Sequence, residues 1–350
     1  MSDIMNEFTW LNGQPVSQGK IKVLPQDFVV KETLGFDFTG EGEHFMVRIR
    51  KTGENTKYVV NELAKACGVK SKNASWAGLK DRHAVTEQWL SIHLPGQDDP
   101  DLTEFVASHP GVEILATARH NKKLRPGDLQ GNKFELRLTE VSDVEDVVKR
   151  LEHIAESGLP NYFGAQRFGH DGNNVTEARR WGRDNVRTRD NNKRSFYLSA
   201  ARSWIFNHVL SQRLEQGTAS TALVGDLLLD SNERLVVVTS DNQSELQAQL
   251  EQGSVQVTGP LAGDNELTTQ GDVEALEQQI LDSEPDLMKL IRGNRMRQER
   301  RSLTLKPQGL TWLVDGNSIT LKFALPAGCF ATAIVRELIE EQAVEPHYAQ

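Results

Sequence analysis

The stretch Trp76-Ala77-Gly78-Leu79-Lys80-Asp81-Arg82-His83-Ala84-Val85-Thr86-Glu87-Gln88-Trp89 is dense in functional side chains and leads into residues 89–94, whose apolar and polar alternation predicts a strand. One carboxylate, Asp81, is flanked directly by the cations Lys80 and Arg82. On pattern alone, a solvated turn before a strand is the commoner explanation of such a triplet. The alternative is a carboxylate that neighbouring cations keep ionised, so that it can act as a base or nucleophile.

The same stretch resembles the active-site motif of the tRNA pseudouridine synthase D (TruD) family. Further segments resemble the family in the expected order, and they are residues 25–30, 40–44, 122–125, 131–134, 160–169, 193–196 and 325–332. The resemblance extends from about residue 22 to about residue 338 and is weakest between about 215 and 290. Several motifs in one order indicate this family far more strongly than any single motif would.

The resemblance implies an α+β protein with two domains. The first is a pseudouridine synthase catalytic domain, with a mixed, largely antiparallel sheet and flanking helices. We place it at residues 1–157 and 305–350, and we place an inserted α/β domain specific to the family, the TRUD domain, at residues 158–304. Gly158-Leu159-Pro160 supports the first boundary, because a helical pattern ends there.

The local patterns predict several elements. Alternating apolar residues predict strands around residues 45–49 and 134–138. Asn55 can cap a helix over 56–67, and Ser142 with Glu145 forms a capping-box pattern before another helix. Further helices are predicted over 200–214 and 332–341.

Composition describes a globular chain with room for two domains. The 350 residues are 38% hydrophobic and 25% charged, and no apolar run approaches membrane-spanning length. The acidic N-terminus lacks the regions of a signal peptide, and two cysteines support neither a disulfide framework nor a cysteine-based zinc site. We therefore expect a cytoplasmic protein with no membrane association. The sequence leaves the oligomeric state open, and our expectation is a monomer with no obligatory protein partner.

The net charge of −9 argues at first against nucleic acid, but the charges are unevenly distributed. Residues 241–287 hold eleven acidic residues and no Lys or Arg, whereas basic residues cluster at 119–133, 179–194 and 289–301. A local basic surface is what contacts with RNA phosphates require. Each cluster could equally be an ordinary solvated face, and the sequence does not show whether the three share one.

Pseudouridine formation breaks the N1–C1′ glycosidic bond and rejoins the uracil through C5. This chemistry needs neither a redox cofactor nor a metal, and we expect none. The sequence contains no phosphate loop, no dinucleotide glycine fingerprint and no His-Glu-x-x-His pattern. His83 and His93 have no further ligands nearby in sequence, so we interpret them as structural or surface residues.

The resemblance makes Asp81 the catalytic carboxylate, which either attacks C1′ of the ribose or removes a proton from C2′. Lys22 matches the basic residue that the family places beside it, although a strand-edge lysine is the plain alternative. Lys80 and Arg82 are the other candidate partners, because adjacency in sequence does not fix where a side chain points.

Four residues match substrate-contact positions of the family: Asn132, Phe134, Phe28 and Phe330. Asn132 and Phe134 are two apart, so on a strand they would share a face. Asn132 would hold the base or Asp81 in register and Phe134 would stack on a uracil that has left its helix. The alternative for each phenylalanine is an ordinary core residue.

Five further residues are candidates for RNA contact. They are Lys122, Lys123 and Arg125 in a basic segment, and Gln166 and Arg167 in a segment that mixes aromatic, amide and cationic side chains. The second segment could equally be a hinge that packs one domain on the other.

We therefore predict an isomerase, an intramolecular transferase that converts uridine 13 in the D arm of tRNA to pseudouridine. One alternative is a non-catalytic RNA-binding or RNA-chaperone protein. Another is a glycoside or nucleoside hydrolase, which would usually need a second carboxylate beside Asp81, and Glu87 is close in sequence.

Overall fold

The structure is a computed structural model that describes residues 4–344. The chain divides into two compact units. The sheet unit comprises Pro15–Ala155, Pro307–Ala331 and residues 338–344. The second unit comprises residues 4–14, Glu156–Lys306 and Thr332–Glu337.

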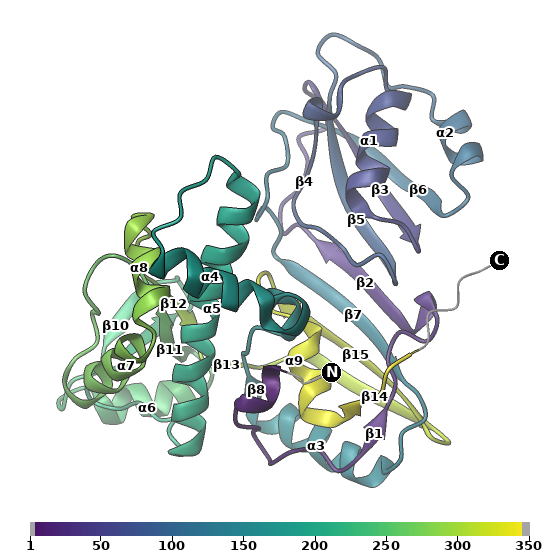
Figure 1. The fold of residues 1–350 in the computed structure, drawn as a ribbon. Coiled ribbons are helices and arrows are strands. Elements are labelled where there is room, and N and C mark those ends of the chain that lie inside the picture. Colours follow the sequence, from purple (N-terminus) through teal and green to yellow (C-terminus); the bar gives the residue numbers. More distant parts are fainter. Residues whose placement is uncertain (1–3, 345–350) are drawn as a thin grey trace. The chain divides into compact units, whose positions relative to one another are not determined.

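The sheet unit is built on one long sheet, whose strands lie in the order β14-β15-β7-β2-β5-β3-β6, with β4 paired to β5 (Figure 1). Only the β2–β5 pair is parallel, and the other pairs of this sheet are antiparallel. The strands are β2 (Phe28–Thr33), β3 (His44–Thr52), β4 (Ala74–Trp76), β5 (Val85–His93), β6 (Val112–His120), β7 (Gly131–Leu138), β14 (Gln308–Asp315) and β15 (Ser318–Pro326). A separate parallel pair joins β1 (Gln18–Gly19) to β16 (Glu340–Glu341).

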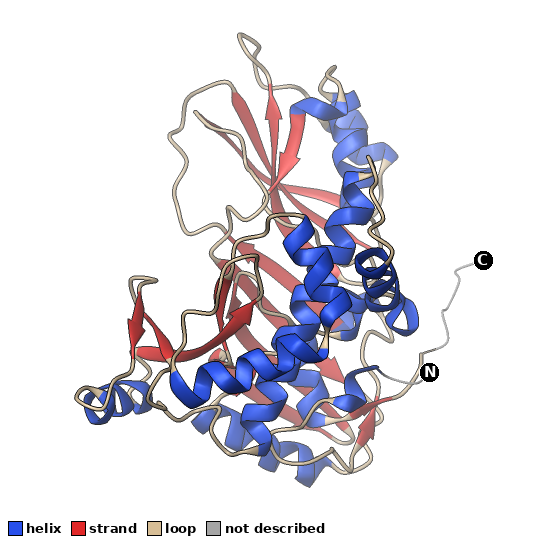
Figure 2. Ribbon diagram, turned by 60° about the vertical axis from the view of Figure 1, so that its left-hand side comes forward, coloured by secondary structure: helices blue, strands red, loops and turns tan. Residues whose placement is uncertain are grey.

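Period-two alternation assigns each strand residue to one face of the sheet. In β3, the side chains of Phe45, Val47 and Ile49 are buried in a core with residues of α1 (Thr56–Ala66) and α2 (Thr103–Ser108). The intervening Arg48 and Arg50 are only partly buried and lie on the opposite face. Figure 2 distinguishes the helices, in blue, from the strands, in red, along the chain.

Of the two helix N-caps predicted from the sequence, the structure contains one and lacks the other. The Asn55 side chain accepts hydrogen bonds from the backbone N–H groups of Lys57 and Tyr58, as predicted for an N-cap of α1. The predicted Ser142–Glu145 capping box is wrong. Asp143 instead accepts from the Asp146 N–H at the start of α3 (Val144–Ser157), because the Ser142 hydroxyl accepts from the Gln18 N–H.

The second unit combines helices with a four-stranded sheet of order β10-β9-β11-β12. Its longest helix, α5, carries the buried side chains of Trp204, Ile205 and Phe206. Its helices include η1 (Ile4–Glu7), η4 (Ala165–Phe168), η5 (His170–Gly172), α4 (Asn173–Arg183), α5 (Asn191–Glu215), α6 (Gln243–Glu251), α7 (Gly271–Ser283), α8 (Pro285–Gly293) and most of α9 (Ala331–Leu338). The strands are β8 (Leu159–Pro160), β9 (Leu227–Asp230), β10 (Leu235–Val237), β11 (Val255–Leu261), β12 (Glu299–Ser302) and β13 (Thr304–Leu305).

The predicted fold class is confirmed: the protein mixes α and β structure around a mixed, largely antiparallel sheet. Two predicted helices have different bounds, because α5 begins at Asn191 and α9 (Ala331–Leu338) ends before β16. The placement of a catalytic domain at 1–157 and 305–350 and of an inserted domain at 158–304 stays a prediction.

Candidate active site

Asp81 lies on an irregular loop between β4 and β5, and the backbone of this loop is contacted by Lys51 of β3 and by Thr56 at the start of α1. Its Oδ2 atom is 2.8 Å from the Lys22 Nζ atom, with the two side chains 40% and 19% exposed, respectively. The carboxylate is thus ion-paired yet still accessible, which is what a group that must reach a substrate requires.

Lys22 reaches Asp81 from an unusual backbone conformation. Its φ is 54°, in the left-handed region that residues with a Cβ rarely adopt. Its Nζ atom also lies 4.2 Å from the centre of the Phe28 ring, within cation–π distance. The strand-edge lysine of the alternative explanation is therefore not what the structure contains.

The other two candidate cations have different partners. Lys80 Nζ lies 2.9 Å from Glu32 Oε2, and these side chains are only 4% and 0% exposed. Glu32 also accepts from the Trp89 N–H, so this pair joins the loop to two strands. Arg82 is exposed and its Nε donates to the Gly53 carbonyl oxygen at 3.3 Å.

Three buried side chains that the sequence interpretation missed hold the backbone of the loop. Thr56, the first residue of α1, exchanges hydrogen bonds with the Lys80 backbone, and Gln88 Nε2 donates to the Gly78 carbonyl at 2.9 Å. Lys51 Nζ donates to the Asp81 carbonyl, also at 2.9 Å. The sequence contains a signal for Lys51, because it continues the inward-facing row of alternate residues in β3.

Asn132, Phe134 and Phe28 share the sheet face on which Lys22 and Asp81 meet. In the ladder between β2 and β7, Glu32 pairs with Asn132 and Phe28 with Leu136, so their side chains lie on one face. Phe134 is 9% exposed, stacks on Phe323 with ring centres 5.3 Å apart, and meets Phe28 edge-on. Both phenylalanines therefore contribute to the core as well as lining this face.

The Asn132 side chain has unused hydrogen-bonding capacity. Its Oδ1 atom is buried and accepts no hydrogen bond from any residue between 4 and 344. A buried acceptor without a donor is unfavourable unless a ligand supplies one. Gly131 before it is required by space, since a Cβ there would lie 2.3 Å from the Leu325 carbonyl oxygen.

Phe330 is half-buried in the turn that follows β15 and contains Gly328. Pro326, at the end of β15, pairs with Gly131 at the start of β7. The fold therefore brings Phe330 to the end of the sheet at which Asn132 lies, although the two are far apart in sequence.

The basic segment forms an exposed loop between β6 and β7. Lys122, Lys123 and Arg125 are exposed, while Leu124 between them is buried in a small core with Met46 and Ala77. The Gly127 N–H donates to the Ala77 carbonyl at 2.8 Å, so this loop is tied to the segment that carries Asp81.

Gln166 and Arg167 belong to η4 in the second unit. Gln166 is exposed, whereas Arg167 is partly buried, donates to the Ser199 hydroxyl and lies over the Phe163 ring. Tyr162, Phe163 and Phe168 are buried. This segment is therefore largely core, and Gln166 is the member whose side chain is open to a partner.

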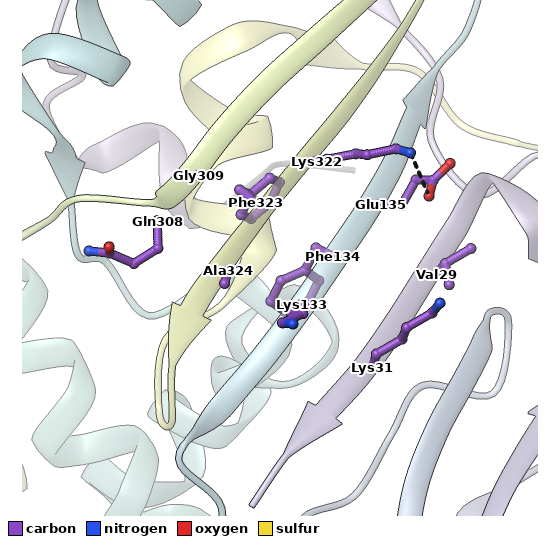
Figure 3. Close-up of a pocket in the computed structure, with 10 residues that line it drawn as sticks. All are labelled: Val29, Lys31, Lys133, Phe134, Glu135, Gln308, Gly309, Lys322, Phe323 and Ala324. Atoms are coloured by element: carbon purple, nitrogen blue, oxygen red, sulfur yellow. Dashed lines mark ion pairs between the residues drawn. The ribbon is translucent and has the colours of Figure 1, made fainter. Parts of the chain in front are cut away.

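A cavity of about 300 Å³ lies on the other face of the long sheet (Figure 3). Its lining includes the charged side chains of Lys31, Lys133, Glu135 and Lys322, and the Lys322 Nζ atom lies 3.6 Å from Glu135 Oε2. Lys133 and Glu135 alternate with Phe134 along β7, but Phe134 and Phe323 also line the cavity, so it adjoins the aromatic residues of the Asp81 face.

The described residues form neither a metal cluster nor a membrane-spanning helix. Between residues 4 and 344, no group of three or more His, Cys, Asp or Glu side chains is placed to hold a metal ion. In the same range, no helix has the length and apolar character needed to span a bilayer.

Comparison with known proteins identifies the family. Residues 5–178 and 182–338 match the family model described as tRNA pseudouridine synthase D (TruD). The tRNA pseudouridine synthase D of Aliivibrio fischeri strain MJ11 is 63% identical over 349 residues, covering 100% of this chain and 99% of that protein. The protein of the same name from Vibrio vulnificus strain YJ016 is 62% identical over 348 residues, covering 99% and 100%, respectively.

A crystal structure from Methanosarcina mazei, described as a candidate tRNA pseudouridine synthase D, has a similar fold. It matches with a TM-score of 0.71 and 23% identity, over 95% of this chain and 94% of that one. The family model covers nearly the whole chain, and the bacterial relatives are matched end to end. The chain therefore belongs to the tRNA pseudouridine synthase D family.

Proposed function

We propose that this protein is a tRNA pseudouridine synthase that isomerises uridine 13 in the D arm, with Asp81 as its catalytic carboxylate. The observation that carries the proposal is the ion pair between Asp81 and Lys22, 2.8 Å long, on the sheet face that also presents Asn132 and Phe28. The proposed enzyme acts as a cytoplasmic monomer on tRNA, without cofactor, metal, membrane or obligatory protein partner.

The reaction exchanges one glycosidic bond for another. The N1–C1′ bond of the target uridine breaks, a C5–C1′ bond forms, the C5 proton leaves to solvent and N1 gains a proton. Asp81 acts either as the nucleophile at C1′ or as the base at C2′, and both roles require its ionised form. Lys22 holds this carboxylate by an ion pair, with its Nζ atom 2.8 Å from Asp81 Oδ2.

The target base must leave its stack to reach Asp81, and the site face has groups suited to receive it. Asn132 has a buried oxygen with no donor among the described residues, and an N–H of uracil can supply one. Phe28, Phe134 and Phe330 would provide aromatic surface for the base. Because Phe134 is already stacked on Phe323, we expect it to meet the base with its edge or remaining face.

We propose contacts with the tRNA backbone at the exposed Lys122, Lys123 and Arg125 and at Gln166. Cationic and amide side chains on accessible loops are typical of phosphate and sugar contacts. Arg167, which is partly buried over Phe163, would act mainly by supporting the segment that presents Gln166.

The test is tritium release from transcribed tRNA labelled at uracil C5, comparing wild type with Asp81→Asn. We expect release by wild type, loss of release in the variant, and similar tRNA binding by both. A transcript with cytidine at position 13 tests the site, because it should yield no release.

Two other outcomes separate the alternatives. Binding of tRNA by wild type without tritium release would favour the RNA-binding protein over the enzyme. Appearance of free uracil in solution would favour a hydrolase, since a synthase retains the base in its product.

A further inference from the structure

Lys51 is a fully buried lysine of β3 that contacts the backbone of the loop that carries Asp81. Its side chain is 0% exposed, and its Nζ atom donates to the carbonyl oxygens of Glu54 at 2.8 Å and Asp81 at 2.9 Å. The Lys80 carbonyl oxygen is 3.5 Å away. Among the described residues, no carboxylate oxygen lies within ion-pair distance of this ammonium group.

Such a group is expensive to bury. Removing an ammonium group from water is unfavourable unless a carboxylate or a full set of acceptors compensates for the lost hydration. Burial lowers the pKa of Lys51 to about 8, the charges of Asp81 and Glu54 raise it, and that of Lys80 lowers it further. The preceding inward-facing residues of this row, Phe45, Val47 and Ile49, are all apolar, so the charged group at Lys51 calls for an explanation.

We propose that Lys51 is a positioning residue for the isomerisation, whose ammonium group fixes the Asp81 backbone and thereby aims the carboxylate at the ribose. The inference rests on the proposed function of Asp81. Three acceptors from two chain segments converge on one donor group, and one of these segments is the loop that carries Asp81. The other is the turn between β3 and α1, which is anchored by the Asn55 cap.

The charged groups that face Lys51 are few. The loop contributes Asp81 and Lys80, and the turn after β3 contributes Glu54. From β5, its ladder partner is Thr86, a neutral residue whose buried hydroxyl has no hydrogen-bond partner among residues 4–344. Its partner on β6 is Val112. Loss of the Lys51 charge above about pH 8 would therefore not be offset by another cation at the same position.

The first experiment compares Lys51→Met with Leu63→Ala, a core variant of α1 in the same unit. Leu63 is fully buried in the core with Val47 and Leu90 and makes no contact with the Asp81 backbone among the described hydrogen bonds. Both variants should melt at lower temperature than wild type. Below their melting temperatures, Lys51→Met should slow single-turnover tritium release by about tenfold or more at unchanged tRNA Kd, and Leu63→Ala should release at the wild-type rate.

A pH series adds a measurement that a merely structural role would not change. The single-turnover rate of wild type should fall as pH rises through about 8, where Lys51 loses its proton. Lys51→Met should be slow throughout and lack this fall. Lys51→Arg keeps its charge throughout this range, so its rate should not fall as pH rises through about 8.

Hydrogen exchange of the loop amides provides a readout that does not depend on activity. Lys51→Met should accelerate exchange in residues 79–84, whereas Leu63→Ala should not do so selectively. Equal rates of tritium release in Lys51→Met, Leu63→Ala and wild type would overturn the inference while leaving the proposed function intact. Absence of release by wild type would instead overturn the proposed function. Hydrogen exchange would then still show whether Lys51 holds the backbone of the Asp81 loop.

Discussion

At the scale of single residues, Lys22 combines an ion pair to Asp81 with a strained backbone conformation. A left-handed conformation costs a residue with a Cβ about 1 kcal/mol or more, and glycine would avoid that cost. At φ 54°, the lysine supplies the ammonium group that Asp81 and the Phe28 ring contact. Under the proposed function, stability therefore favours glycine at this position and catalysis favours lysine.

A matched pair of variants tests this conflict. Lys22→Gly and Lys22→Ala both remove the ammonium group, so both should lose tritium release by about tenfold or more. Lys22→Gly should be the more stable of the two by about 1 kcal/mol in urea unfolding, because only alanine keeps the strained Cβ. Equal stabilities would show that the backbone at this residue relaxes once its side chain is removed.

The two cysteines should differ in reactivity. Burial raises the pKa of Cys67 to about 11, whereas Cys329 is half-buried beside Phe330. The thiolate is the reactive form, so a maleimide should label Cys329 and leave Cys67 unmodified in the native protein. Mass spectrometry of labelled peptides provides the measurement, and labelling of both residues in urea is its control.

Protection by substrate then tests where Phe330 lies. If Phe330 contacts the target base, bound tRNA should slow labelling of Cys329. Labelling at an unchanged rate with saturating tRNA would place this turn outside the RNA contact.

At the scale of elements, the Asp81 loop is held in place by contacts with neighbouring elements and not, among the described residues, by hydrogen bonds within the loop. Lys80 is buried against Glu32 of β2, and Thr56 at the start of α1 bonds to the Lys80 backbone. The sequence motif thus separates two neighbouring roles: Asp81 points to the accessible side and Lys80 into the core. Although Lys80 and Asp81 are adjacent and oppositely charged, Asp81 pairs with Lys22 and Lys80 pairs with Glu32.

A double-mutant cycle measures the buried pair. Lys80→Met should destabilise the protein by roughly 3–5 kcal/mol, because it leaves the Glu32 carboxylate buried without its cation. Adding Glu32→Gln should recover a large part of this loss, since the amide oxygen can still accept from the Trp89 N–H. Urea unfolding of wild type, the two single variants and the double variant gives the coupling free energy between Lys80 and Glu32. Additive effects of the two substitutions on stability would contradict a buried, coupled pair.

Across the whole molecule, the sequence predicted those features that depend on local pattern. The alternating row in β3 and the Asn55 cap could be recognised because each is determined by residues a few positions apart. The partner of Asp81 among three cations could not be deduced from spacing, since it depends on a left-handed turn at Lys22. Lys51 was overlooked because a charged residue at a strand end is normally solvated, and only the fold shows what covers it.

Salt dependence tests the proposed RNA surface of the sheet unit. Replacing Lys122 and Lys123 with alanine should weaken tRNA binding and reduce the slope of log Kd against log salt by about 1.5, assuming each contacts a phosphate. Leu124 is kept, so the loop should stay anchored. Lys65→Met, on an exposed face of α1, is the matched control and should leave the slope unchanged.

The pH dependence of stability is also a property of the whole molecule. Because the pKa of Lys51 falls from 10.5 to about 8 on folding, the unfolded chain binds more protons between these values. The free energy of unfolding should therefore rise with pH across this window, by up to roughly 3 kcal/mol through this group. Lys51→Met should lack that rise and Leu63→Ala should keep it, as measured by urea unfolding at several pH values.

The ladder between β7 and β15 has a consequence for synthesis on the ribosome. Leu138 pairs with Ile319, so about 180 residues must be translated before the partner of β7 exists. At about 5–20 residues per second, the nascent chain carries an unpaired β7 edge for roughly 10–40 s, and such edges attract other chains. Slower codons within 139–317 should increase aggregation during expression, whereas the same change after residue 326 should not.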